Sequence, residues 1–460
     1  MLVPETSATR ELAEFAVGVS YDMLPEPVAE RIKSCILDAL GCCLFGVTLP
    51  WTRMLIDLVD EEGGNPQARV IGTGRKTSVS QAVLIGATAG HGFEMDDIHA
   101  AAHLHAGSLA VPTALALADA HAPVDGRRLI AAIAAGYEVG LRVALAATGK
   151  LFMRGHHFQG ACGPFVAAAT AANLLRLAPE AARHALGIAG SFGAGLMAAQ
   201  EGAMSKRLHS GRAAQAGVYG ALLAARGFTG IANVLEASYG GFLSTFSGEP
   251  KMDYLTAGLA ESWEILAVGF KPYATAASVQ SVLYAIDGLM AENGLGATDI
   301  DDVIIHCSTM AHRHCAWPYE PSGVTAAQMN LFFTSAMMIL DRNAMQDQFR
   351  EHRLAEPAVL AMIDRIRIEI DPKYDLGGDA TRHCARVALR SKDGRRFERE
   401  VLQRPGSPAN PLPPRQLLRK FETLAAAVLP PARIGDIVAA VGKLEENQDC
   451  RSLTDLLTTG

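Results

Sequence analysis

Histidines and carboxylates gather in one stretch of the sequence. Six histidines fall within 67 residues, beside three acidic residues: His91, His99, His103, His105, His156 and His157, with Glu94, Asp96 and Asp97. Imidazole titrates near neutral pH and carboxylates tune it, so such a group suits general acid–base chemistry. If residues 94–105 form one helix, Glu94, Asp97 and His105 share one face of it at 100° per residue.

Two other interpretations of this stretch stay open. The spacing His99-x3-His103-x-His105 beside acidic residues also fits a zinc or manganese site, because imidazole and carboxylate are usual ligands. Alternatively, the histidines are solvated or cap turns in an exposed loop.

A second group lies in the segment RGHHFQGACGPF. Proline suits the first position of a helix, so Gly163-Pro164 predicts a helix start, with His156 and His157 in the glycine-rich loop before it. Free N–H groups and the helix dipole favour an anion at such a place. We therefore expect a histidine here to move a proton on a bound carboxylate.

Cations precede another predicted helix, in the segment KRLHSGR. Lys206, Arg207 and Arg212, with His209 among them, stand where they can hold a carboxylate at a helix start. A solvated basic turn is the alternative.

Two isolated residues complete the set. Lys271 lies in GFKPYA, and Tyr319 lies in the proline-rich segment CAWPYEPSG, which could reach over a cleft. With the histidines they supply a base, an acid of high pKa and cations that stabilise enolate-like charge. Proton removal next to a carboxylate requires these three.

Apolar residues at helical spacing dominate the sequence up to about residue 265. Val28, Ile32, Ile36 and Cys43 mark one buried face, for example. The same spacing predicts helices at 80–92, 109–122, 127–147, 164–177, 179–190, 211–226 and 230–237.

From about residue 300 the apolar period changes to two. Alternation predicts strands within 301–310, 365–372 and 384–403, with a hairpin turn at Lys392-Asp393-Gly394 and helices at 324–341 and 355–363. The tail from Pro411 returns to helix. We therefore predict a mainly α protein, with a large all-helical domain (1–265 with 405–460) and a smaller α+β lid domain (266–404).

Composition excludes several classes of protein. The 460 residues carry 41 Lys+Arg and 48 Asp+Glu, a net charge of −7, and 49% are hydrophobic, as in ordinary globular proteins. The absence of a long basic block argues against nucleic-acid binding. The longest nearly apolar stretch, 185–199, is shorter than a membrane span, and the first residues do not resemble a signal peptide, so we expect a cytoplasmic protein. Eight cysteines without a C-x-x-C pair predict reduced, buried thiols.

With these motifs in place, the chain resembles the MmgE/PrpD family over nearly its whole length. The matching text lies at residues 68–120, 154–172, 206–230, 269–274 and 406–412. The resemblance implies a large helical domain made from both chain ends, a smaller α+β lid, an active site in the cleft between them, a homodimer, and no metal or organic cofactor.

The resemblance also assigns site residues. His105 falls on the histidine of the family's His-Pro-Gly-like turn, His157 on that of its Gly-aromatic-His segment, Lys206 on the lysine before its Leu-His-x-Gly turn, and Lys271 on that of its Lys-Pro-Tyr segment. Glu94 and Asp97 lie in its acidic stretch, and Tyr319 resembles the lid tyrosine.

Two positions and one segment depart from the family's usual text. Ala106 stands where members often have Pro, Glu94 stands where many have Asp, and residues 274–280 lack the Cys and His that often follow Lys-Pro-Tyr. These differences lie where substrate would be held, so a less charged acid, or one with an apolar arm, stays an alternative substrate.

We predict a cofactor-independent lyase or isomerase that removes a proton from a carbon of a small di- or tricarboxylate. Dehydration of a 2-methylcitrate-like acid is placed first. Decarboxylation of cis-aconitate-like acids and epimerisation of iminodisuccinate-like acids are alternatives, because all three reactions pass through enolate-like species. A metal-dependent hydrolase using His99, His103 and His105, and a non-catalytic polycarboxylate binder, are the rivals from other classes.

Each predicted site residue has an expected role. His157 or His105 is the base, and Tyr319 or the other histidine is the acid. Lys206, Lys271 and Arg207 hold carboxylates, His156 and His209 contact the substrate, and Glu94 and Asp97 orient the histidines.

Overall fold

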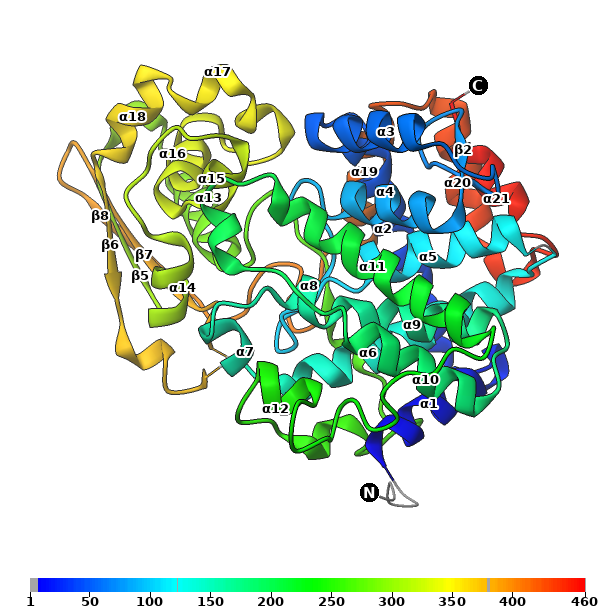
Figure 1. The fold of residues 1–460 in the computed structure, drawn as a ribbon. Helices are drawn as coiled ribbons and strands as arrows, with labels where there is room; N and C mark the ends of the chain where they lie inside the picture. Colours follow the sequence, from blue (N-terminus) through cyan, green and yellow to red (C-terminus); the bar gives the residue numbers. More distant parts are fainter. Residues whose placement is uncertain (1–6, 122, 379–380, 460) are drawn as a thin grey trace.

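The computed structural model describes residues 7–121, 123–378 and 381–459. It is mainly helical with one small mixed sheet, which confirms the predicted fold class (Figure 1). Two apolar cores organise the chain. One belongs to the helices of the N-terminal part together with the C-terminal tail, and the other belongs mainly to residues 274–401, with Cys42, Leu49, Phe93, Met95 and Leu424 added from the first part and the tail. We call these the helical unit and the small unit.

The helical unit begins with helices and two short strand pairs. Its elements before residue 270 are α1 (Ala8–Gly18), α2 (Glu26–Gly46), α3 (Pro50–Glu62), β1 (Ala68–Arg69), β2 (Lys76–Thr77), α4 (Val79–Gly90), β3 (Ile98–His99), α5 (Gly107–Ala120), α6 (Gly126–Ala147), α7 (Lys150–Met153), α8 (Phe158–Ala161), α9 (Gly163–Leu174), α10 (Pro179–Gly190), α11 (Ser205–Ala224), α12 (Phe242–Phe246) and β4 (Val268–Gly269). β1 pairs with β2, and β3 pairs with β4.

Helix α6 is the centre of this unit. Side chains cannot be added at two of its glycines, because a Cβ on Gly136 would lie 1.9 Å from Thr170 Oγ1 and one on Gly140 would lie 2.1 Å from Val166 Cγ2. The two glycines therefore let α6 and α9 approach closely. By length and apolarity α6 could cross a membrane, but 94% of its most apolar window is buried inside the protein, as expected for a central core helix.

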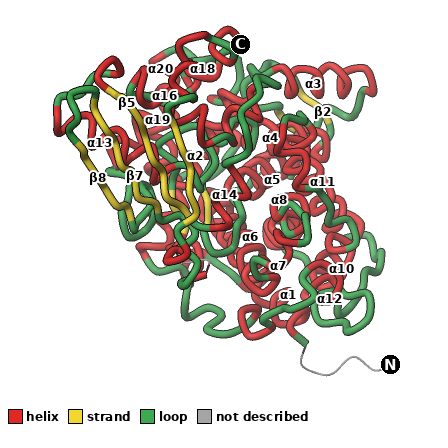
Figure 2. Tube along the Cα trace, turned by 90° about the vertical axis from the view of Figure 1, so that its left-hand side faces the viewer, coloured by secondary structure: helices red, strands yellow, loops and turns green. Residues whose placement is uncertain are grey.

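The small unit joins a four-stranded sheet to a layer of helices. Its elements are α13 (Gln280–Asn293), β5 (Ile300–Cys307), α14 (Thr309–Cys315), α15 (Val324–Met329), α16 (Leu331–Asp341), α17 (Glu351–Leu354), α18 (Pro357–Ile363), β6 (Ile366–Ile370), β7 (Ala385–Ser391) and β8 (Arg396–Val401). The strand order is β6-β5-β7-β8, with β5 and β6 parallel and the other pairs antiparallel. Figure 2 shows the strands side by side, with helices behind them.

The strands and the hairpin turn of this unit agree with the sequence prediction. Gly394 adopts φ +90° in the turn between β7 and β8, a conformation that favours glycine. The predicted helix at 324–341 is instead two helices, α15 and α16. Asn330 separates them, because its side chain accepts a hydrogen bond from the N–H of Phe333 and so caps α16.

The C-terminal tail packs back on the helical unit, as predicted. Its helices are α19 (Pro414–Ala425), α20 (Pro431–Gly442) and α21 (Arg451–Leu456), drawn in orange to red beside the blue α2 in Figure 1. Phe421 of α19 lies against Gly41 of α2, where a Cβ would be 3.3 Å from the Phe421 backbone. Lys420 of α19 donates to the buried Asp38 of α2 at 2.7 Å.

The predicted helix at 230–237 is wrong. The segment forms turns, although Val234 and Leu235 are buried. Gly230 lies so close to the backbone of α10 that a Cβ would be 2.3 Å from His184 O. The segment is thus held by tertiary packing against α10, which its apolar spacing does not reveal. The eight cysteines are free and buried, as predicted.

We predict that Phe421→Ala destabilises the protein by about 3–5 kcal/mol, because it empties a fully buried site between α19 and α2. Urea unfolding followed by circular dichroism measures the change. Phe228→Ala, at a side chain that is 57% exposed, is the control and should cost far less. Equal effects of the two substitutions would contradict this view of the tail.

Candidate functional site

A cavity of about 60 Å³ lies where the helical and small units meet. The helical unit and the segment after β4 contribute the polar side chains of Glu94, His103, His105, His157, Lys206 and Lys271. The small unit contributes Ser278, His314, Arg382 and His383. The cavity therefore gathers cations and histidines from both parts of the chain, among apolar side chains such as Phe152, Phe158 and Met329.

The acidic stretch forms turns rather than the predicted helix over 94–105. α4 ends at Gly90, Glu94 adopts φ +57°, and Ile98 and His99 form β3 against β4. The pairing with β4 is long-range, so local spacing could not reveal it. The predicted shared face of Glu94, Asp97 and His105 is therefore wrong, and the residues take separate places around the cavity.

Three cations surround the buried carboxylate of Glu94. Lys206 and Arg207 both contact Oε1, and Lys271 Nζ lies 3.4 Å from Oε2. Burial alone raises the pKa of Glu94, but the charges of Lys206, Lys271 and Arg207 outweigh it and hold the pKa well below its usual value. A second buried carboxylate, Asp96, lies 4.0 Å from Lys271 Nζ through its Oδ1. Two carboxylates thus face three positive charges, which leaves the cluster with one positive charge in excess.

The cations lie inside a helix, not before it as predicted. α11 begins at Ser205, so Lys206, Arg207 and His209 occupy its first turns. Lysine, arginine and leucine favour helix. Gly211, which suggests a turn in the sequence, serves close packing instead, since a Cβ there would lie 2.1 Å from Thr88 Oγ1 of α4.

Arg207 faces away from the cavity lining. It is fully buried, its Nη2 donates to Gln328 Oε1 at 2.8 Å, and its guanidinium lies over the Trp51 ring. Gln328 in turn donates to the backbone carbonyl of Phe93 at 2.9 Å. Arg207 therefore joins the Glu94 cluster to the small unit, whereas Lys206 and Lys271 line the cavity.

Two histidines share the carboxylate of Asp96. His91 Nδ1 lies 2.8 Å from Asp96 Oδ2, and His105 Nδ1 lies 3.3 Å from Oδ1. His105 Nδ1 is also 2.6 Å from the carbonyl oxygen of Asp97, which can only accept, so this atom carries the proton. In the neutral His105 ring, Nε2 is then the atom that accepts a proton. Burial lowers the pKa of His91 to about 4, against the opposing effect of Asp96.

His157 contacts His209 through their Nδ1 atoms, 3.0 Å apart. Burial and the charge of Lys206 lower the pKa of both, well below the usual value for His157 and to about 4 for His209. Both rings are neutral at pH 7, so one Nδ1 donates and the other accepts. His157 therefore has a protonated Nε2 when His209 donates and a bare Nε2 when His157 donates.

Asp97 lies behind the cavity lining. Its Oδ2 accepts from the Tyr137 hydroxyl and its Oδ1 accepts from the N–H of Gly107 at 3.1 Å. Burial raises its pKa to about 7, with Asp38 and Asp96 adding to the effect. Asp97 thus supports the turn that carries His105 and does not face the cavity.

The structure does not bring His156 or Tyr319 into the cavity lining. His156 packs edge-on against Phe246, with ring centroids 4.9 Å apart. The Tyr319 hydroxyl donates to the carbonyl of Leu354 at 2.8 Å, and its ring lies 5.0 Å from that of Phe333. The hydroxyl is therefore engaged within the small unit, and Tyr319 does not take the role of acid in this arrangement.

Sequence reasoning missed the residues that the small unit brings to the cavity. Arg382 Nη2 donates to the carbonyl of Ala100 at 2.6 Å, and its Nη1 lies 2.9 Å from His103 Nδ1. His314 Nδ1 lies 3.3 Å from Ser278 Oγ. The basic pair Arg382-His383 just before a predicted strand was the signal that could have pointed here.

The predicted metal set of His99, His103 and His105 does not assemble. His99 Nε2 lies 3.3 Å from Glu264, and His103 is engaged with Arg382. Among the described residues, one group has ligand atoms within 4.8 Å of one another, namely His91, Asp96 and His105. Their Nδ1 protons already point at oxygen acceptors, an arrangement typical of hydrogen-bonded histidines.

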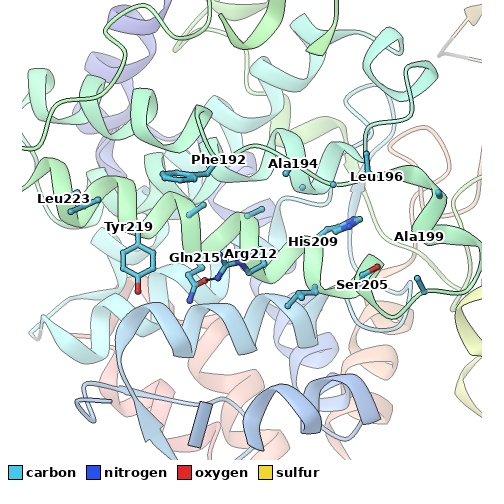
Figure 3. A pocket seen from close by; sticks show the side chains of 17 residues that line it. Phe192, Ala194, Leu196, Ala199, Ser205, His209, Arg212, Gln215, Tyr219 and Leu223 are labelled. Atoms are coloured by element: carbon cyan, nitrogen blue, oxygen red, sulfur yellow. Dashed lines mark hydrogen bonds between the residues drawn. The ribbon is translucent and has the colours of Figure 1, made fainter. Parts of the chain in front are cut away.

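A larger groove of about 790 Å³ runs along α11 on the outside of the helical unit (Figure 3). It is mostly apolar, with Phe192, Leu196 and Tyr219 on its walls. His209 also lines it. The pair His157–His209 therefore separates the inner cavity from this outer groove.

Comparison with known proteins places these residues in context. The MmgE/PrpD N-terminal domain matches residues 10–255, and the MmgE/PrpD C-terminal domain matches residues 273–444. A cis-aconitate decarboxylase of Aspergillus terreus is 31% identical, with 98% of this chain and 96% of that protein covered. The human cis-aconitate decarboxylase is 28% identical (98% and 94% covered), and the cis-aconitate decarboxylase-like protein oryM of Aspergillus oryzae is 29% identical (99% and 98% covered). These relatives favour the decarboxylation alternative over the dehydration that the sequence analysis placed first.

We predict that Asp97 makes stability fall as pH rises. Between about pH 4 and pH 7 the folded protein holds a proton on Asp97 that the unfolded chain has released, so folding loses free energy through this window. Asp97→Asn removes this titration. Between pH 5 and pH 7, the free energy of unfolding should fall by roughly 2–3 kcal/mol less in the variant than in wild type.

Urea unfolding at the two pH values measures the difference. Asp22→Asn, at a side chain that is 83% exposed, is the matched control and should follow wild type. Parallel pH dependence of wild type and Asp97→Asn would contradict a protonated Asp97.

Proposed function

Because the chain belongs to the MmgE/PrpD family of enzymes, we propose that it is a carboxy-lyase that decarboxylates cis-aconitate or a closely related unsaturated tricarboxylate. The observation that carries this proposal is the charge of the cavity. Glu94 and Asp96 together compensate only part of the positive charge of Lys206, Arg207 and Lys271. A polyanion restores the balance, because a buried uncompensated charge is costly.

The reaction needs a site that accepts negative charge and supplies a proton. The bond between carbon and the departing carboxylate breaks, CO₂ leaves, and the electron pair becomes a new C=C bond. The former vinyl carbon, whose charge is shared with its own carboxylate as an enediolate, then takes one proton. Each turnover therefore consumes one proton and produces an unsaturated dicarboxylate.

The residues divide these tasks. The ammonium groups of Lys206 and Lys271 line the cavity, where they stabilise the enediolate charge. His157 donates the proton from Nε2 as its Nδ1 takes the Nδ1 proton of His209, and His209, which lines the outer groove, takes a replacement proton from solvent at Nε2, so neither ring is left as an imidazolate. The Nδ1 contacts with Asp97 and Asp96 hold the His105 ring so that Nε2 is its proton-accepting atom. His105 can therefore accept a proton from the same carbon and return it.

Admission of the substrate requires movement of the small unit. A cavity of about 60 Å³ holds roughly four waters, less than a tricarboxylate occupies. The contact of Arg382 with Ala100 is one of those that must open.

We predict that the EDTA-treated protein converts cis-aconitate in deuterated buffer and that the product carries one deuterium on carbon. Proton NMR measures both the conversion and the deuterium incorporation. His157→Ala and His105→Ala should each lower kcat by about 100-fold or more, as loss of a general acid or base does. His352→Ala, an exposed histidine of α17, is the control and should keep full activity.

The same spectra separate the alternatives. Turnover of 2-methylcitrate or iminodisuccinate in place of cis-aconitate would overturn the decarboxylase assignment. Activity that appears only with added zinc or manganese would support a metal-dependent hydrolase, and binding without turnover of any of these acids would indicate a non-catalytic binder.

We also propose that the chain acts as a homodimer, with the groove along α11 covered by a second copy. Phe192, Leu196 and Tyr219 are 59%, 65% and 46% exposed, and clustered exposed apolar side chains mark interaction surfaces. The cation of the groove, Arg212, is engaged by Gln215, so the surface suits an apolar partner such as itself.

Sedimentation velocity tests this arrangement. Wild type should sediment as a dimer, and Leu196→Asp should shift it to monomer. Leu376→Asp, at a side chain that is 88% exposed on the small unit, should remain dimeric. A monomeric wild type would overturn the proposal.

A further inference from the structure

His383 is a buried histidine whose ring has no protein partner in the described chain. It is 8% exposed, it lines the cavity, and neither Nδ1 nor Nε2 has a hydrogen-bond partner. Buried polar groups are almost always paired, and an unpaired one costs stability. A buried ring that lines a cavity and makes no hydrogen bond therefore indicates that a ligand atom bound in the cavity supplies the missing hydrogen-bond partner.

The surroundings of His383 are positively charged. Its charged and titratable neighbours are Arg382, Arg404, His103 and His314. Arg404 is 4% exposed, and its Nε and Nη2 also have no hydrogen-bond partner among the described residues. Burial and the charge of Arg382 lower the pKa of Arg404 to about 10, so it remains a cation at neutral pH.

The other walls at this end offer little polarity. Ala276 and Ala277 contribute only methyl side chains, and the Ser278 hydroxyl is engaged with His314. Burial and the nearby arginines keep the pKa of His383 well below its usual value. The ring is therefore neutral and offers one N–H donor, with the guanidinium groups behind it supplying the charge.

We propose that His383 is a specificity-determining residue that donates a hydrogen bond to a second carboxylate of the substrate, at the end of the cavity built by the small unit. This inference rests on the proposed function and names the substrate class more closely. One carboxylate lies at Lys206 and Lys271, and another lies at His383 in the field of Arg382 and Arg404. An acid with an apolar arm at this end, which the sequence left open, binds poorly.

Substrate and transition state both accept the hydrogen bond from His383, so its loss weakens binding of both equally and changes KM rather than kcat. His383→Leu should raise KM for cis-aconitate about 10- to 100-fold and leave kcat within about threefold. His383→Gln keeps an N–H donor and should recover most of this loss. His352→Leu on α17 is the matched control and should leave both constants unchanged.

A second measurement separates binding from folding. His383→Leu removes an unsatisfied polar group from a buried site, so the unliganded variant should melt at the same temperature as wild type or higher. A structural role predicts the opposite. An unchanged KM in His383→Leu would overturn the proposal, whatever the melting temperature of the variant.

Failure of the proposed function is recognised independently. If wild type does not turn over cis-aconitate, calorimetric binding of propane-1,2,3-tricarboxylate still tests the subsite. A dissociation constant that rises at least 10-fold in His383→Leu supports the subsite without the reaction. Equal binding by wild type and variant overturns it.

Discussion

The buried carboxylate of Glu94 is the constraint on which the site depends. Its cost of burial is offset only because Lys206, Arg207 and Lys271 converge on it from α11 and from the segment after β4. The same cations need Glu94, since without it Asp96 would be the one carboxylate among the described ion pairs left to offset three positive charges. Arg207 extends the network to Gln328 of the small unit. The charge cluster therefore fixes both the cavity floor and the junction between the two units.

Around this fixed charge, His91, His157 and His209 are kept neutral. Burial and the lysines lower the pKa values of His91, His157 and His209, so the rings exchange protons without adding charge. The proposed decarboxylation consumes a proton and disperses negative charge, and the site offers separate groups for these two demands. The lysines hold charge, and the pair His157–His209 holds the proton in one of two tautomeric arrangements.

Local features of the chain were predictable, and long-range pairings were not. The start of α9 at Gly163-Pro164 and the β7–β8 turn follow from residue chemistry that acts over a few positions. The turns at Glu94 depend on the pairing of β3 with β4, about 170 residues away, and Gly211 lies inside α11 as a close contact with α4 rather than in a turn. His383 reaches the cavity only through the docking of the small unit. Composition and spacing therefore identified Lys206, Lys271, His105 and His157, whereas His383 joins the cavity lining only through the fold.

The most direct test of the account is a crystal structure with the non-reactive propane-1,2,3-tricarboxylate. The account predicts the ligand in the inner cavity between the two units, with one carboxylate on Lys206 and Lys271 and another on His383. A ligand bound only in the outer groove along α11, or one that leaves both lysines uncontacted, would contradict it.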